Sequence, residues 1–264
     1  MLAGAASGRP PIILFVYEAR AENMALGPFY VAEKLKQTGG VRGAALLMRH
    51  GETPWNREGR VMGRNPVELD AHGRAQVSNA IDFVRALEPT LIVTSPLVRA
   101  RQSAEIIAAG IGGGVPIREE PQIAEVQYGR WEGMNYEELL VDADYLRYRD
   151  EPILSATPGG ENIVEVQARG VAAVMRILGE AEGQRVLFVS HGDIIRTVLC
   201  HFMALDLRHF RRIRVDNAAL SAVQLAGEFA EVKFLNVIPD IGRAFVAPFP
   251  VRPAADSPAE EEDD

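Results

Sequence analysis

Residues 46–56 of the chain read LLMRHGETPWN. The uninterrupted apolar run Ala44–Met48 is typical of a strand that is buried on both faces of a parallel sheet. The run ends at once in Arg49 and His50, and a glycine, a carboxylate and a proline follow. Because core strands do not usually end in this way, the stretch predicts a central strand with a functional site at its carboxyl end.

Two other buried strands are predicted, and each leads into a similar group. Leu91–Val93 runs into the segment TSPLVRA, which places Arg99 in the first turn of the next helix. Val186–Val189 runs into VSHGD, which contains His191 and Gly192. Since neighbouring parallel strands end at the same edge of a sheet and ligands bind beyond that edge, the three strand ends are expected to form one site.

The rest of the chain alternates helices with strands. Helices are expected at residues 71–87, 96–109, 136–149, 162–182 and 194–204, and further strands at 116–118, 219–225 and 232–235. Asp70 should cap the first of these helices and Ser95 the second, with Pro96 at its first position. The alternation predicts an α/β fold of three layers, α/β/α, around a mostly parallel central sheet.

A single domain at residues 44–246 accounts for this pattern, and 264 residues with 47% hydrophobic side chains suffice for its core. Residues 1–43 are expected to be an N-terminal extension or an accessory strand and helix, and residues 247–264 an acidic, disordered tail. The apolar run Ile12–Tyr17 is short and follows two prolines. Neither a signal peptide nor a membrane span is therefore expected, and cytoplasmic localisation is the default.

The formal net charge is −8, but six acidic residues and no basic residue lie after Ala254, so the rest of the chain carries only −2. A nearly neutral body offers no basic field to nucleic acid or to an anionic membrane, and neither is expected as a partner. One cysteine, Cys200, excludes an intrachain disulfide and a multi-cysteine metal site. That cysteine content suits a reducing compartment.

The predicted site gathers two guanidinium and two imidazole groups, those of Arg49, Arg99, His50 and His191. Taken singly, a histidine at a strand end is usually a loop residue with a hydrogen-bond partner, and an arginine in a first helical turn is usually on the surface. Together they would bury so much positive charge that an anion is needed to offset the cost. With helix N-termini pointing the same way, the most plausible ligand is an oxyanion such as phosphate.

Four segments of the chain are similar to motifs of the histidine phosphatase superfamily, also called phosphoglycerate-mutase-like, and they occur in the same order and at compatible spacing. The segments are LLMRHGETPWN, TSPLVRA, AEVQYGRWEG and VSHGD. The chain resembles the phosphatase branch of that family over roughly residues 44–236. The resemblance implies a phosphoglycerate-mutase-like fold and hydrolysis of a small phosphorylated metabolite through a phosphohistidine. It implies a nucleophile (His50), a general acid (Glu125) and groups that bind the phosphoryl oxygens (Arg49, Asn56, Arg99, His191 and Gly192).

Some alternatives stay open at this stage. Glu52 is nearer than Glu125 to the nucleophile in sequence and rivals it as the proton donor. A mutase-type phosphotransferase and a catalytically silent phosphate-binding module are the alternative functions. The short segment 129–160 after the glutamate motif, and the absence of a Gly-Trp pair after Asn56, favour water as the acceptor.

No cofactor and no metal ion is expected, because a third histidine or similar ligand in a local motif is missing and the arginines would repel a cation. Residues 59–68, 128–148 and 208–214 are expected to select the substrate. Apolar side chains near these loops hint at a partly apolar leaving group: Met62, Val67, Met134 and Leu154. Residues 1–43 could form a lid or a homodimer contact.

Overall fold

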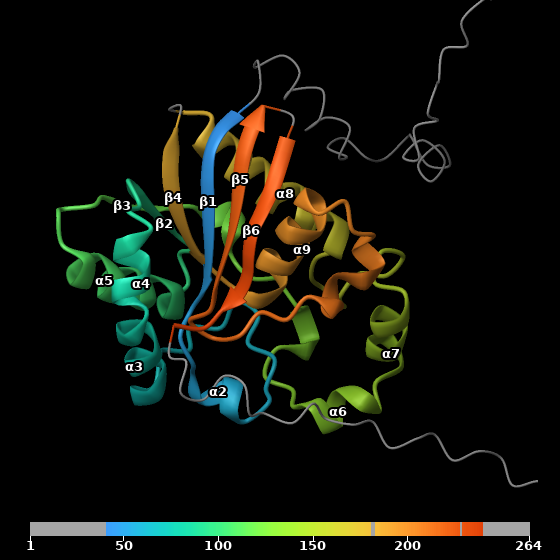
Figure 1. Ribbon diagram of the computed structural model, residues 1–264. Helices are drawn as coiled ribbons and strands as arrows, with labels where there is room; N and C mark the ends of the chain where they lie inside the picture. Colours follow the sequence, from blue (N-terminus) through green and yellow to red (C-terminus); the bar gives the residue numbers. More distant parts are fainter. Residues whose placement is uncertain (1–40, 181–182, 228, 240–264) are drawn as a thin grey trace, which may run out of the picture.

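The computed structural model describes residues 41–180, 183–227 and 229–239 (Figure 1). The acidic tail predicted at residues 247–264 lies outside these ranges, and so does the predicted N-terminal unit except for its last three residues. Those three residues, 41–43, belong to the first strand of the domain.

A six-stranded sheet forms the centre of the domain, with the strand order β3-β2-β4-β1-β5-β6. The strands are β1 (Val41–Arg49), β2 (Leu91–Thr94), β3 (Ile117–Glu119), β4 (Gln184–Ser190), β5 (Leu220–Gly227) and β6 (Phe229–Val237). The first four strands in this order pair in parallel, whereas β5 and β6 add an antiparallel edge. The prediction of a mostly parallel sheet is confirmed.

Helices cover both faces of the sheet. The helices are α2 (Pro54–Arg57), α3 (Ala71–Asn79), α4 (Ile81–Ala86), α5 (Val98–Ile111), α6 (Tyr136–Leu140), α7 (Ala143–Asp150), α8 (Ile163–Leu178) and α9 (Gly192–Phe202), with short 3₁₀ helices η1 (Pro121–Ile123), η2 (Gly129–Trp131) and η3 (Leu207–Arg212). Leu47 of β1 packs into a core with α8 and α9, while its neighbours Leu46 and Met48 pack into a second core with α3, α4 and α5. This alternation of side chains across the strand produces the three predicted layers.

Two of the predicted helices are each divided in two. The segment 71–87 contains α3 and α4, and Ala80 is both the C-cap of the first and the N-cap of the second. Asp70 does cap α3, since its carboxylate accepts a hydrogen bond from the amide of Gly73. The segment 136–149 divides into α6 and α7, because Asp142 starts a new helix by accepting from the amide of Tyr145.

The predicted cap at Ser95 is wrong. Helix α5 begins two residues later than expected, at Val98, and Leu97 is its N-cap. The amide of Ser95 still donates to Val189 of β4 at 3.0 Å, so the chain remains extended there. The Ser95 hydroxyl accepts from the amide of Leu97 at 3.2 Å and also pairs with the ring of His191 at 2.7 Å. Arg99 lies in the first turn of α5, as predicted.

Candidate active site

The carboxyl ends of three adjacent parallel strands meet at one point of the sheet edge. Arg49 at the end of β1 lies opposite Ser190 at the end of β4, and the amide of His50 donates to Ser190 O at 3.0 Å. The His50 and His191 ring centroids are 5.2 Å apart. The structure thus brings together the four side chains that the sequence singled out, Arg49, His50, Arg99 and His191.

His50 is almost fully buried, and its hydrogen bonds define which ring nitrogen can react. Its Nδ1 lies 2.7 Å from the carbonyl oxygen of Gly51, which can only accept, so the ring hydrogen is on Nδ1. Nε2 therefore carries a lone pair and accepts a 3.3 Å hydrogen bond from Arg99 Nε. Burial, assisted by the charges of Arg99 and Arg49, lowers the pKa of His50 well below its ordinary value. The imidazole is therefore neutral, and Nε2 is a potential nucleophile.

The two arginines are fixed by backbone carbonyl groups. Arg99 donates from Nη1 to Asn65 O at 3.0 Å and from Nη2 to Gly63 O at 2.7 Å. Arg49 donates from Nη1 to Val215 O at 2.8 Å, while its Nε is buried without a hydrogen-bond partner. Within the described part of the chain, neither guanidinium has a carboxylate at ion-pair distance. Burial lowers the pKa of Arg99 to about 10, so it stays charged at neutral pH.

His191 lies behind His50 and is fully buried. Its Nε2 is 2.7 Å from the hydroxyl of Ser95, whose oxygen also accepts from the amide of Leu97 at 3.2 Å. In the tautomer in which the Ser95 hydroxyl donates to Nε2, the ring hydrogen of a neutral His191 is on Nδ1. That Nδ1 is buried and has no partner. Burial and the charge of Arg99 lower its pKa well below the ordinary value for histidine.

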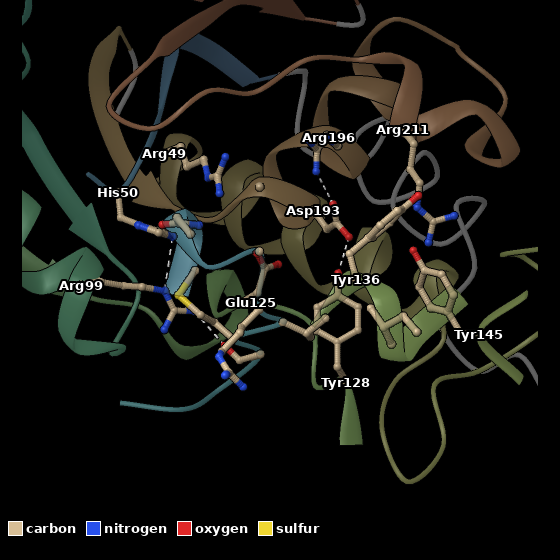
Figure 2. Close-up of a pocket in the computed structure, with 18 of the residues that line it drawn as sticks. Arg49, His50, Arg99, Glu125, Tyr128, Tyr136, Tyr145, Asp193, Arg196 and Arg211 are labelled. Carbon is tan, nitrogen blue, oxygen red and sulfur yellow. Dashed lines mark hydrogen bonds and ion pairs between the residues drawn. The ribbon is translucent and has the colours of Figure 1, made fainter. Parts of the chain in front are cut away.

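A cavity of ≈ 350 Å³ opens from this cluster (Figure 2). Arg49, His50 and Arg99 line one end of it. Asn56 also lines it, with its Oδ1 accepting from the amide of Thr53 in a capping box, which leaves Nδ2 for a ligand. Gly192, the first residue of α9, lines it too. The guanidiniums of Arg49 and Arg99, which no described carboxylate neutralises, suit the oxygens of a phosphoryl group, whereas His191 does not line the cavity although its buried Nδ1 has no partner.

Glu125 is the carboxylate that faces His50 across the cavity. Its Oε1 accepts from the amide of Val126 at 3.0 Å. Burial, with a further contribution from Asp193, raises the pKa of Glu125. Glu52, the rival in the sequence, does not line the cavity, and its carboxylate lies 3.3 Å from Arg57 Nε. The geometry therefore favours Glu125 as the group that exchanges a proton.

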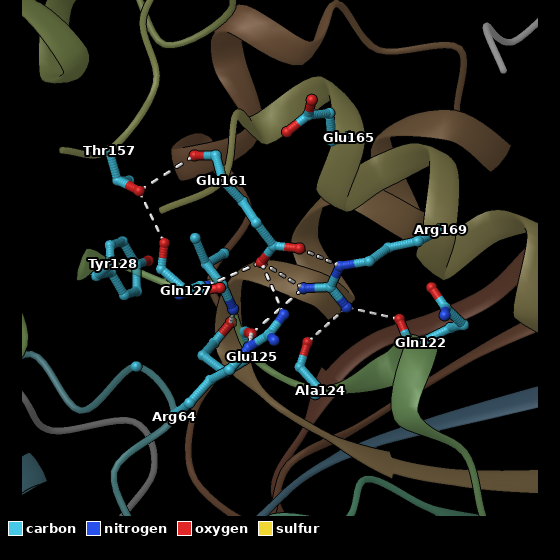
Figure 3. A network of polar contacts seen from close by, with 12 residues as sticks. Arg64, Gln122, Ala124, Glu125, Gln127, Tyr128, Thr157, Glu161, Glu165 and Arg169 are labelled. Atoms are coloured by element: carbon cyan, nitrogen blue, oxygen red, sulfur yellow. Dashed lines mark hydrogen bonds and ion pairs between the residues drawn. The ribbon is translucent and has the colours of Figure 1, made fainter. Parts of the chain in front are cut away.

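One side chain of helix α8 holds the turn that carries Glu125 (Figure 3). Arg169 donates from Nη1 to Gln122 O and Ala124 O, at 2.6 and 2.7 Å, and from Nη2 to Glu125 O at 3.3 Å. Its Nε donates to Glu161 Oε1 at 2.9 Å. The three carbonyl groups belong to the four-residue segment 122–125, so one planar guanidinium fixes their relative positions.

The same network extends to the cavity loop. Glu161 Oε2 accepts from the amide of Gln127 at 2.8 Å and lies 3.2 Å from Arg64 Nη2. Sequence analysis gave Arg169 and Glu161 no role. The available signals were the Pro-Gly-Gly-Glu segment that contains Glu161 and a charged residue among the apolar positions of α8, where the Arg169 side chain is only 13% exposed.

Asp193 is a second buried carboxylate on the cavity that the sequence reasoning did not assign. The hydroxyl of Tyr128 donates to its Oδ2, and Arg196 Nη1 donates to its Oδ1 at 2.5 Å. Burial alone would raise the pKa of Asp193, but Arg196 and Arg211 outweigh burial and lower it. Asp193 is therefore ionised, and its charge is one reason that Glu125 holds its proton to a higher pH.

The predicted specificity loops contribute unevenly to the cavity. Residues from all three ranges line it, including Met62, Tyr128, Tyr145 and Arg211. Of the four apolar side chains named from the sequence, only Met62 does so, and Leu154 is 76% exposed to solvent. The hint of an apolar leaving group therefore rests on Met62 alone.

No group of three His, Cys, Asp or Glu side chains in the described part of the chain is arranged to hold a metal ion. None of the helices within the described ranges has the length and apolar character needed to cross a membrane.

Comparison with known proteins places this geometry in a family. The model of the histidine phosphatase superfamily (branch 1) matches residues 45–238. The chain is 32% identical over 194 residues to the uncharacterized phosphatase PhoE of Bacillus subtilis, covering 74% of this chain and 94% of that protein. It is 33% identical over 182 residues to the probable phosphoglycerate mutase GpmB of Klebsiella pneumoniae (strain 342), covering 67% and 82% of the two chains.

Solved structures share the fold. YhfR of Bacillus stearothermophilus superimposes with a TM-score of 0.68 at 30% identity, covering 72% of this chain and 95% of its own. A mycobacterial glucosyl-3-phosphoglycerate phosphatase, solved with VO3, gives a TM-score of 0.67 at 25% identity, covering 74% and 99% of the two chains.

Proposed function

The chain belongs to the histidine phosphatase superfamily, and from this we propose that it hydrolyses small phosphomonoesters through a phosphohistidine intermediate on His50. The family and its phosphatase relatives support a phosphoric monoester hydrolase. One observation carries the proposed mechanism: a neutral His50 with a lone pair on Nε2 lies beside two arginines that no carboxylate neutralises within the described residues.

In the first step, His50 Nε2 attacks phosphorus and the bond from phosphorus to the ester oxygen breaks. In the free enzyme, Arg99 Nε donates a hydrogen bond to His50 Nε2. When the phosphoryl group binds, its oxygens accept this hydrogen bond instead, and the Nε2 lone pair is free to attack phosphorus. The hydrogen bond from Nδ1 to Gly51 O stabilises the positive charge that develops on the ring. Arg49 and Arg99, which line the cavity, donate to the phosphoryl oxygens and stabilise charge on the transferring group.

Glu125 supplies the proton that the leaving oxygen needs. Its raised pKa keeps a larger share of the carboxyl protonated near neutral pH. In the second step a water molecule attacks phosphorus, the phosphorus–nitrogen bond breaks, and the Glu125 carboxylate accepts a proton from that water. Inorganic phosphate leaves, and His50 and Glu125 return to their starting protonation states.

The cluster of Arg49, His50, Arg99 and His191, called the phosphate cup from here on, needs no metal ion in this proposal. Arg49 and Arg99 supply two positive charges where a metal would supply its own, and the same charges disfavour binding of a cation. We expect turnover to survive dialysis against a chelator. The mycobacterial relative solved with VO3 supports an oxyanion as the species held in a cup of this kind.

Hydrolysis and phosphoryl transfer to a second substrate remain to be separated by experiment, because relatives carry both names, phosphatase and probable mutase. With 4-nitrophenyl phosphate and with 3-phosphoglycerate, we expect release of inorganic phosphate with ¹⁸O from labelled water. Rapid formation of 2-phosphoglycerate with only a trace of phosphate release would identify a mutase instead. A rate no higher than that of a His50→Ala variant would indicate a silent phosphate-binding protein.

Replacing Asp193 with asparagine should move the alkaline limb of the pH profile of kcat/KM to lower pH. The ionised Asp193 raises the pKa of Glu125, and its removal also leaves the charge of Arg196 uncompensated nearby. Both changes favour the Glu125 carboxylate, so the protonated acid is lost at lower pH. The measurement is kcat/KM across pH for an alkyl phosphate, whose leaving group needs a proton.

The exposed Asp82→Asn variant on α4 is the matched control, since it removes one negative charge far from the cavity. Its pH profile should match that of the parent. An alkaline limb that stays in place or moves to higher pH in Asp193→Asn would show that Asp193 does not tune Glu125.

A further inference from the structure

The end of the cavity remote from His50 has a chemistry of its own. Figure 2 shows Tyr145 and Arg211 at the opposite end from His50 and Arg99, with Asp193 between the two groups. The far end is lined mainly by tyrosines and one arginine: Tyr128, Tyr136, Tyr145, Tyr148 and Arg211. The alcohol part of a phosphomonoester bound in the cup would extend toward this end.

Arg211 is held in a defined orientation although it is exposed. Its guanidinium carbon lies 4.8 Å from the ring centroid of Tyr148 and 4.6 Å from that of Phe210. Its Nη1 donates a long hydrogen bond, of 3.3 Å, to Arg149 O. Among the described residues, no carboxylate lies within ion-pair distance of it. Two aromatic rings therefore fix an arginine whose charge is not neutralised by a contact.

Tyr148 supplies a second polar group that is left without a partner. The side chain is fully buried on helix α7, and its hydroxyl has no hydrogen bond. Its ring packs against Trp131, with the centroids 5.4 Å apart, and the residue lines the cavity. A buried hydroxyl without a partner is costly in a folded protein unless a ligand supplies the missing contact.

This end of the cavity carries one positive charge that no carboxylate contact neutralises. Arg196 is paired with Asp193 at 2.5 Å, whereas Arg211 has no such partner among the described residues. The charge of Arg211 does reach the cavity, because it contributes to the lowered pKa of Asp193. One unpaired guanidinium suits a monoanion, and the planar fork of arginine matches a carboxylate.

We propose that Arg211 and Tyr148 form a subsite for a carboxylate on the alcohol part of the substrate. The inference rests on the proposed phosphatase activity and narrows its substrates to phosphomonoesters with a second, carboxylate group. Arg211 donates to the carboxylate, and the Tyr148 hydroxyl donates a further hydrogen bond. The tyrosine rings pack against the carbon atoms between the phosphate and the carboxylate.

A matched pair of substrates tests this subsite. The carboxyphenyl phosphates, substituted at position 3 or 4, are compared with the carbamoylphenyl phosphates of nearly the same shape. For each enzyme the ratio of kcat/KM, carboxylate over amide, is measured. Comparing ratios between variants cancels the difference in leaving-group reactivity within each pair. Both positions are used because they place the carboxylate at two distances from the phosphorus.

For at least one of the two positions, Arg211→Gln should lower this ratio about tenfold, the effect of losing one charge-assisted contact. Tyr148→Phe, which keeps the ring and removes only the hydroxyl, should lower it about threefold. Arg212→Gln is the control, since it removes the same charge from the same 3₁₀ helix at a side chain that does not line the cavity. Its ratio should equal that of the parent.

The possible outcomes distinguish failure of the carboxylate subsite from failure of the proposed phosphatase activity. A ratio that is unchanged in Arg211→Gln and Tyr148→Phe, with all esters hydrolysed, would overturn the subsite and leave the phosphatase standing. No hydrolysis of either ester by the parent would instead contradict the proposed function. Hydrolysis of the amide ester by a variant shows that it is folded, and Tyr148→Phe tests the subsite if Arg211→Gln fails to fold.

Discussion

Replacing His50 with asparagine is expected to reduce kcat by about 10⁴-fold or more, because the variant has no ring nitrogen that can form the covalent intermediate. Asparagine is close in size and can still donate from its amide to Gly51 O, so the buried site should tolerate it. The measurement combines steady-state rates with reactions of ³²P-labelled substrate that are stopped in alkaline SDS, in which a phosphohistidine survives. The parent should yield an acid-labile phosphoenzyme, and the variant should not.

His72→Asn is the control for this experiment, because His72 is an exposed histidine on α3. It should retain both the rate and the phosphoenzyme. The His50→Asn variant should still bind inorganic phosphate, since Arg49 and Arg99 do not depend on the imidazole for their backbone contacts. A variant that keeps a substantial rate would exclude His50 as the nucleophile.

Glu125→Gln is expected to lower kcat/KM for alkyl phosphates by about 10²- to 10⁴-fold, the usual contribution of a general acid. With 4-nitrophenyl phosphate the loss in kcat/KM should be small, because nitrophenolate leaves without being protonated. The second step still lacks its base. Nitrophenol should therefore appear in a burst of about one equivalent per active site, followed by slow turnover.

Glu52→Gln is the matched control for the acid, since Glu52 is the rival carboxylate in the sequence and does not line the cavity. It should lose little activity on either class of substrate. If Glu52→Gln loses activity on alkyl but not on nitrophenyl phosphates, and Glu125→Gln does not, then Glu52 and not Glu125 is the proton donor. Equal losses on alkyl and nitrophenyl esters in Glu125→Gln would point to a binding role and not to acid catalysis.

The network around Arg169 explains how a loop residue can act as a positioned acid. Glu125 lies between η1 and η2 and outside every helix and strand. Arg169 holds three carbonyl oxygens of that segment, and Glu161 links it to the amide of Gln127. Because Arg169 comes from the long helix α8, the turn is anchored to the core and the Glu125 side chain is set at a defined place.

Parts of the fold were predictable because they depend on local patterns. The apolar runs of β1, β2 and β4 have the composition of doubly buried strands, and the residues after them stand out by their charge. The helix boundaries were less predictable. The break at Ala80 has no proline or glycine to mark it. Helix α5 starts two residues later than expected, and Ser95 before it pairs with His191, which lies 96 residues away in the chain.

The sequence by itself determined the α/β architecture and the gathering of Arg49, His50, Arg99 and His191, because strand periodicity and the common edge of parallel strands are local and topological properties. Only the tertiary structure placed Glu125 and not Glu52 on the cavity, left the lone pair of His50 on Nε2, and brought Arg169, Asp193, Tyr148 and Arg211 to the site. These results depend on contacts between residues that are distant in the chain, and loop backbones acquire their conformation from those contacts and not from their own sequence.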